Sequence, residues 1–120
     1  MLRYLLMVAV LSACGDSIDT SIEDQITIEQ GVYGLLISGC DTSGCKDQPA
    51  ANEHVVVYAA GSTGIFAQVL SDKHGVYQMN LVGGDYTLCT SSCTTVTVPA
   101  NNKVRYDWTS GPGGGYWSPD

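Results

Sequence analysis

A two-residue hydrophobic alternation runs through residues 27–109 and constrains the fold more than any other feature of this chain. It is carried by short runs rich in valine, threonine and tyrosine, which are separated by turns containing glycine, asparagine, aspartate or serine. Such runs are typical of half-buried β-strands. Because no helical stretch long enough for a parallel crossover intervenes, the pattern predicts an all-β fold, a seven-stranded antiparallel sandwich. The predicted strands lie at residues 27–38, 54–59, 65–70, 76–81, 86–89, 94–98 and 104–109.

Residues 1–13 have the composition of an export signal. A positive charge at Arg3 precedes the apolar run 5–11, and two small residues then lead to Cys14. An uncleaved membrane span is excluded by length, because crossing a bilayer takes about 20 apolar residues. A buried core helix is disfavoured, because polar and acidic residues follow Cys14 at once. The segment is therefore interpreted as a signal peptide that is removed on export.

The stretch Leu11-Ser12-Ala13-Cys14 resembles the signal of bacterial lipoproteins, which ends in an obligatory cysteine. The resemblance implies a diacylglycerol thioether on Cys14, cleavage after Ala13 and acylation of the new amine by a palmitate-like chain. Two or three acyl chains, at about 0.8 kcal/mol per buried methylene, make attachment effectively permanent. Glycine rather than aspartate follows Cys14, which in a Gram-negative cell implies the outer membrane. The chain is therefore expected in the cell envelope, with the membrane as its partner through the lipid.

The charge balance excludes one class of partner. After residues 1–13 are removed, 107 residues remain, and their four basic side chains stand against twelve acidic ones. Such a surface repels phosphate backbones and anionic headgroups, so no nucleic-acid partner is expected. The remaining length suits one domain.

Two segments flank the predicted domain, which is placed at residues 27–109. Residues 14–26 are predicted to be an acidic tether, because acidic residues are frequent there and no basic residue offsets them. The spacing of Ile18, Ile22 and Ile26 also fits a short amphipathic helix. Residues 110–120 are predicted to be a flexible glycine-rich tail.

Four segments, in order, resemble the motifs of carboxypeptidase regulatory-like domains. They are a glycine-bearing strand at residues 34–36, a proline-led loop into a Val-x-Val strand at 49–58, a Ser-Asp-x-x-Gly-x-Tyr hairpin at 71–77 and a Leu-x-x-Gly-x-Tyr-Thr-Leu hairpin at 81–88. The resemblance covers residues 31–109 and implies a transthyretin-like Greek-key sandwich with a non-catalytic accessory or binding role. The chain departs from the family in a Gly-Gly turn without proline and in its added cysteine pairs.

The glycines and tyrosines of the two hairpin motifs have structural interpretations. Gly75 and Gly84 are expected where turns need a positive φ. Tyr77 and Tyr86 each follow such a glycine by two residues. We expect both rings inside the sandwich, with their hydroxyls bonded near its rim. An aromatic platform for a ligand is the alternative.

Four cysteines remain besides Cys14, and an even number in an exported chain favours two disulfides. Three connectivities are possible. We predict Cys40–Cys45 and Cys89–Cys93, the latter because its short spacing brings two strand ends face to face. The alternative is a zinc site with four thiolates, although the spacing departs from the usual C-x2-C pairs.

Catalytic constellations are not evident in the sequence. His54 and His74 are its only histidines, and one enters a strand while the other lies in a turn. A transthyretin-like hydrolase would be expected to end in Tyr-Arg-Gly-Ser, whereas this sequence ends in Tyr-Trp-Ser-Pro-Asp. An intradiol-dioxygenase-like iron site needs two closely spaced histidines, whereas His54 and His74 are 20 positions apart. We therefore predict no catalytic residue, cofactor or metal, and a structural or binding module with a protein or glycan partner. The alternative is a small envelope metal-binding protein or enzyme using His54 and His74.

Overall fold

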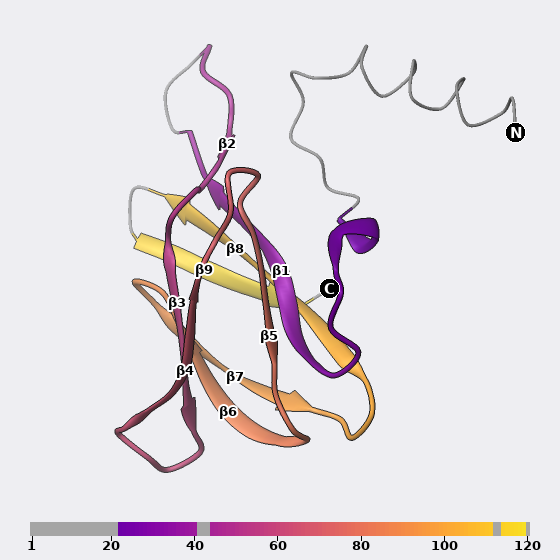
Figure 1. Ribbon diagram of the computed structural model, residues 1–120. Coiled ribbons are helices and arrows are strands. Elements are labelled where there is room, and N and C mark those ends of the chain that lie inside the picture. The colour runs from indigo at the N-terminus through magenta and orange to yellow at the C-terminus, as the bar shows by residue number, and fades with distance from the viewer. Residues whose placement is uncertain (1–21, 41–43, 112–113, 120) are drawn as a thin grey trace, which may run out of the picture.

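The computed structural model describes residues 22–40, 44–111 and 114–119 and shows an all-β protein built from two sheets (Figure 1). The expectations for residues 1–13, for lipidation at Cys14 and for the tether up to residue 21 lie outside the described residues. In the described part of the chain, no helix has the length and apolar character needed to cross a membrane.

The described residues form one short 3-10 helix and nine strands. They are η1 (Glu23–Gln25), β1 (Gly31–Ser38), β2 (Gln48–Pro49), β3 (His54–Ala59), β4 (Ile65–Leu70), β5 (Val76–Asn80), β6 (Gly84–Cys89), β7 (Cys93–Val98), β8 (Lys103–Gly111) and β9 (Gly114–Pro119). The first sheet has the order β2-β1-β8-β9, with β5 also paired to β1. The second sheet has the order β4-β3-β6-β7.

All seven predicted strands are present, as β1 and β3 to β8. Two corrections concern the sheets themselves. The prediction of a purely antiparallel fold is wrong, because β1 and β8 pair in parallel. The count also rises, because β2 and β9 join the seven among the described residues. The first strand begins at Gly31 rather than at residue 27.

The main core lies between the two sheets. Alternate residues of the strands point into it, as in β7, where Val96 and Val98 are buried while Thr95 and Thr97 are exposed. This is the alternation from which the strands were predicted. The buried members of the core are Val32, Leu36, Val55, Val57, Tyr77, Met79, Leu81, Tyr86, Leu88, Val96, Val98 and Trp108.

A smaller apolar cluster covers the other face of β1, where the segment before the strand runs alongside it (Figure 1). Ile22 is fully buried in this cluster together with Tyr33, Leu35 and Val76. The prediction of a solvated tether is therefore wrong for Ile22, whereas Glu23 and Asp24 are exposed. The alternative of an amphipathic helix is realised only as the single 3-10 turn η1.

The glycine-rich tail also departs from its prediction. Residues 114–119 form strand β9, which pairs antiparallel with β8 and places Trp117 directly opposite Trp108. Glycine has low strand propensity, but the Trp117 side chain packs against the core and compensates for it.

Gly34 is needed where three strands meet in the first sheet. It lies opposite Tyr77 of β5, and a Cβ at this position would overlap the carbonyl oxygen of Tyr106 in β8. Next to it, the Leu35 N–H donates to the Asp107 carboxylate at 2.9 Å. A side-chain oxygen is therefore the acceptor here, in place of a backbone carbonyl of the neighbouring strand. The glycine of the first motif thus allows the strands to approach closely.

Candidate functional site

The two motif tyrosines lie inside the sandwich. Tyr77 is 1% exposed, and its hydroxyl donates to the Tyr106 carbonyl oxygen at 2.6 Å. Burial, and to a lesser degree the nearby Asp107 carboxylate, raises the pKa of Tyr77 well above its usual range, so the phenol stays a donor. The Tyr86 hydroxyl donates to the Val82 carbonyl oxygen at 2.7 Å. Buried rings of this kind do not offer an exposed aromatic platform.

The two motif glycines lie at or beside turns, but the expectation of hairpins is wrong, because β4 and β6 belong to the second sheet and β5 belongs to the first. Gly75 closes the turn between β4 and β5 with φ of 80°. Gly84 has φ of 156° and is the first residue of β6. In the first of these turns, the Asp72 carboxylate accepts the backbone N–H groups of His74 and Val76 at 2.8 and 2.9 Å. These bonds close the turn from within.

The histidines occupy different places at the surface. His54 is the exposed first residue of β3, and His74 lies exposed in the turn between β4 and β5. Among residues 22–40, 44–111 and 114–119, no three His, Cys, Asp or Glu side chains are grouped so that they could hold a metal ion.

The structure brings the cysteines together in the two predicted pairs. The Cys40 and Cys45 Cα atoms are 6.0 Å apart, and those of Cys89 and Cys93 are 4.1 Å apart. Both pairs are close enough to be compatible with disulfides. Cys89 ends β6 and Cys93 begins β7, directly opposite one another in the register of the hairpin. Cys14 lies outside the described residues.

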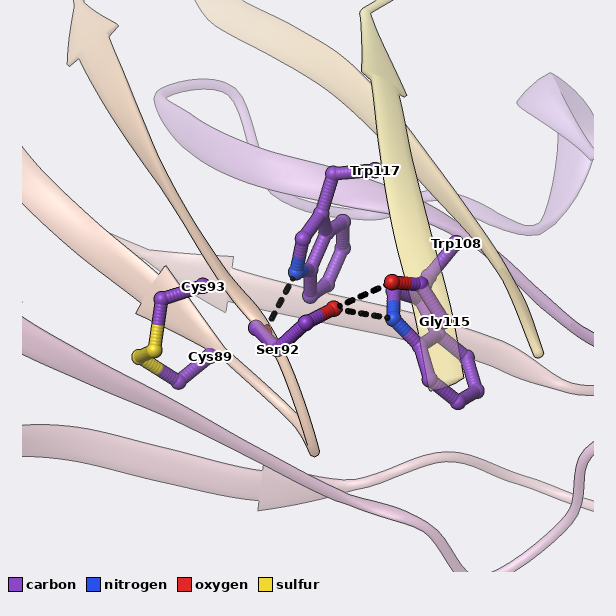
Figure 2. Close-up of a disulfide and its surroundings, with 6 residues drawn as sticks. All are labelled: Cys89, Ser92, Cys93, Trp108, Gly115 and Trp117. Carbon is purple, nitrogen blue, oxygen red and sulfur yellow. Dashed lines mark hydrogen bonds between the residues drawn. A yellow bond between two sulfur atoms is a disulfide. The ribbon is translucent and has the colours of Figure 1, made fainter. Parts of the chain in front are cut away.

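The turn closed by Cys89–Cys93 reaches across the sandwich to the other sheet through Ser92. Its hydroxyl accepts the indole N–H of Trp108 at 3.1 Å and donates to the Gly115 carbonyl oxygen at 2.8 Å. Its backbone carbonyl oxygen accepts the indole N–H of Trp117 at 2.8 Å. Figure 2 shows the Ser92 side chain pointing toward the indoles, while the disulfide lies on the other side of the hairpin. We call these three hydrogen bonds the Ser92 clasp.

The indoles held by the clasp are packed closely. Trp108 is 4% exposed, and its ring centroid is 6.4 Å from that of Trp117. The Trp117 ring also meets Tyr77 edge-on at 6.1 Å. Gly115 is required here, because a Cβ would overlap the Trp108 indole. The clasp thus fixes the end of β9 against the second sheet.

A shallow hollow of about 310 Å³ lies over the disulfide on the outward-facing side of the second sheet. Tyr58 and Thr87 line it, and they alternate along their strands with the inward-facing Val57 and Leu88. No charged side chain is among the residues that line the hollow, which are Tyr58, Ser62, Thr63, Thr87, Cys89 and Cys93. One sulfur of the pair belongs to an exposed residue, Cys93, and the other to Cys89, which is 7% exposed.

Sequence reasoning identified the cysteines but not the clasp. Ser92 is one of several serines and threonines in its turn, and nothing in the spacing distinguishes it. The available signal was the pair of tryptophans, the only two in the chain, since buried indole N–H groups need acceptors. No protein-family model matches the chain, and no curated protein matches it either.

Proposed function

We propose that the chain is an exported, lipid-anchored protein of the cell envelope, and that its sandwich is a non-catalytic structural or binding module displayed at the membrane surface. The stretch Leu11-Ser12-Ala13-Cys14 after an apolar run carries this proposal. Lipid on Cys14 is the anchor, and in a Gram-negative cell the outer membrane is the destination. The anchored state needs more than one acyl chain, because one chain binds a membrane only marginally.

Two features of the folded part support export. The four described cysteines are close in pairs, which suits an oxidising compartment, where disulfides persist. The acidic balance of the chain keeps a surface-displayed domain soluble and away from anionic headgroups.

For the fold family, we propose a transthyretin-like Greek-key sandwich of the carboxypeptidase regulatory-like type. The positions of its motif residues support this assignment. Asp72 organises the turn between β4 and β5, and Tyr77 and Tyr86 lie inside the sandwich on β5 and β6. Gly34 lies where an added Cβ would overlap the Tyr106 carbonyl oxygen of the neighbouring strand.

A structural or binding role is supported by the use that the fold makes of its polar side chains. Ser71, 2% exposed, donates to the Ala50 carbonyl oxygen at 2.6 Å and accepts the Glu53 N–H at 2.9 Å. Ser92 and Tyr77 are likewise engaged in holding strands together. Buried polar groups satisfied in this way stabilise one arrangement of the chain.

We place the surface for an envelope protein or glycan partner at β4, the end strand of the second sheet. Ile65, Phe66 and Leu70 of this strand are 57%, 54% and 49% exposed. Large apolar side chains at an open strand edge are typical of interaction surfaces.

The test of the anchor is a comparison of Cys14→Ser with Cys45→Ser in the full chain, each expressed in a bacterial host that processes lipoproteins. We expect the wild type and Cys45→Ser to fractionate with membranes, to incorporate labelled palmitate and to begin at residue 14. Cys14→Ser should lose the label and keep its leader. The proposal fails if the wild-type chain is found in the cytosol, unlabelled and with residues 1–13 still attached.

A further inference from the structure

The pair Cys89–Cys93 joins the two strands of a hairpin, and it differs from other such disulfides in what lies on its two sides. On the outward side is the uncharged hollow. On the inward side is the Ser92 clasp, whose hydrogen bonds are drawn in Figure 2. The state of the disulfide is therefore connected, through one turn of three residues, to both tryptophans of the chain. We propose that Cys89–Cys93 is a thiol–disulfide exchange site, at which a dithiol reductant enters through the hollow and releases the Ser92 clasp.

Access to the disulfide supports the first step. Cys93 is exposed, and both cysteines line the hollow. Exchange proceeds by attack of a thiolate, which is negatively charged. The chain has a formal charge of −7, but no acidic side chain lines this hollow, so an approaching thiolate meets little local repulsion.

The exchange can be written with all atoms accounted for. The first thiolate of the dithiol attacks Cys93 Sγ, the bond between the two sulfurs breaks, and Cys89 leaves as a thiolate that takes up a proton. The second thiol of the reductant then attacks the mixed disulfide, closes its own ring and releases Cys93. The dithiol is oxidised by two electrons, and the protein gains two electrons and two protons.

A dithiol is specified because a monothiol would be expelled. The pairing of β6 with β7 keeps Cys89 and Cys93 opposite one another after the bond is broken. The Cys89 thiol is thus present at a high effective concentration beside any mixed disulfide on Cys93. It re-forms the original bond unless a second thiol of the reductant reacts first.

The turn itself supports release of the clasp. The Thr90 hydroxyl is buried with no hydrogen-bond partner in the part of the chain that the structure describes, which carries a free-energy cost. The Thr90 N–H also shares the Ser92 carbonyl oxygen with Trp117. Once the cysteines are freed, the turn can rotate to expose the Thr90 hydroxyl to water, and Ser92 then moves away from the indoles. The remainder of the fold stays, because neither cysteine belongs to the main core.

The test follows the two indole N–H signals by NMR in the full chain carrying Cys14→Ser, so that Cys14 contributes neither a thiol nor a lipid and the proposed anchor has no bearing on the result. In the Cys40→Ser/Cys45→Ser background, dithiothreitol should reduce Cys89–Cys93 while the backbone spectrum stays folded. Exchange of both indole hydrogens should become at least about tenfold faster. An equivalent concentration of a monothiol should leave the spectrum of the oxidised protein in place.

The matched control is Cys89→Ser/Cys93→Ser, which keeps only Cys40–Cys45. We expect fast indole exchange in this variant from the start and no further change on reduction. In Ser92→Ala with both disulfides intact, the Trp108 indole hydrogen should also exchange faster, because the variant removes the hydroxyl that accepts it. The Trp117 indole hydrogen should change less, because its acceptor is the Ser92 backbone carbonyl oxygen. Should these variants fail to fold, mass spectrometry after alkylation of the otherwise unaltered Cys14→Ser chain still reports which pair is reduced in the folded state.

Two results would overturn the proposal. One is a Cys89–Cys93 disulfide that dithiothreitol reduces only when the whole domain unfolds. The other is a pair that is reduced in the folded state while both indole hydrogens keep their original exchange rates.

Discussion

Strands β1 and β4 belong to one sandwich but have opposite surroundings. The first six residues of β1 are buried, whereas no residue of β4 is fully buried. β1 has partners on both edges and apolar clusters on both faces, while β4 is the end strand of its sheet. β1 and β4 both contribute residues that contact the main core. The difference between them therefore teaches that burial of a strand depends on what covers its other face and its second edge.

The largest effect is expected for Leu36→Ala. Leu36 is fully buried in the main core, on the face of β1 that meets the second sheet. Removing its side chain leaves a cavity that a packed core fills only in part, and we expect a loss of about 3 kcal/mol in the free energy of unfolding. Urea denaturation of the variant and the wild type measures it. A loss below about 1 kcal/mol would mean that the two sheets are not packed against one another at this point.

A somewhat smaller effect is expected for Leu35→Ala, which tests the other face of β1. Leu35 is 1% exposed and packs in the cluster that contains Ile22. We expect a loss of about 2 kcal/mol by the same measurement. If residues 22–26 were a solvated tether, Leu35 would lose the cover of Ile22 and Ile26, and the loss would be much smaller. The comparison of the two leucines therefore decides whether β1 is covered on both faces.

The signal for double burial was present in the sequence of β1, although it was not used. Residues 31–38 form a nearly continuous apolar run, which is typical of a strand covered on both faces. The alternating strands, such as β3 and β7, were predictable because one face of each is exposed. The parallel pairing of β1 with β8 was not predictable, because local alternation contains no information about which distant strand becomes the neighbour.

The candidate site also has one part that was predictable from local sequence and one part that was not. Cys89 and Cys93 are close in sequence, and their pairing followed from a short spacing. Ser92 contacts residues 16 to 25 positions away, and β9 is held by side-chain contacts that its glycine-rich composition conceals. Local chemistry was therefore visible in the sequence, whereas contacts between the sheets required the structure.

The next effect depends on pH and concerns the segment that covers β1. A hydrogen bond with its own backbone, followed by Arg105 and the Tyr33 hydroxyl, lowers the pKa of Glu23 below its usual 4.5, despite an opposing desolvation. Arg105 Nη1 is 2.9 Å from the Glu23 carboxylate. Because the pKa is lowered in the folded state, the stabilisation is complete above the unfolded pKa and is lost as the pH falls through the folded value.

We expect Glu23→Gln to be less stable than the wild type at about pH 7, and the two proteins to converge at about pH 3. The difference should be smaller than that of either leucine variant, since the Glu23 side chain is largely exposed. Urea midpoints at the two pH values measure it, with Glu29→Gln as a control that lies outside this ion pair. A difference that persists unchanged at the acidic pH would show that charge on Glu23 is not its cause.

The smallest effect is expected on β4. Leu70 is 49% exposed, and replacing it by threonine keeps a residue with good strand propensity while removing apolar surface. The free energy of unfolding should change by no more than about 0.5 kcal/mol, because the side chain is already half in water. If the same substitution weakens binding to an envelope extract while stability is unchanged, the apolar residues of β4 serve a partner rather than the core. A loss close to that of Leu36→Ala would instead show that β4 is covered as β1 is, and the contrast between the two strands would not hold.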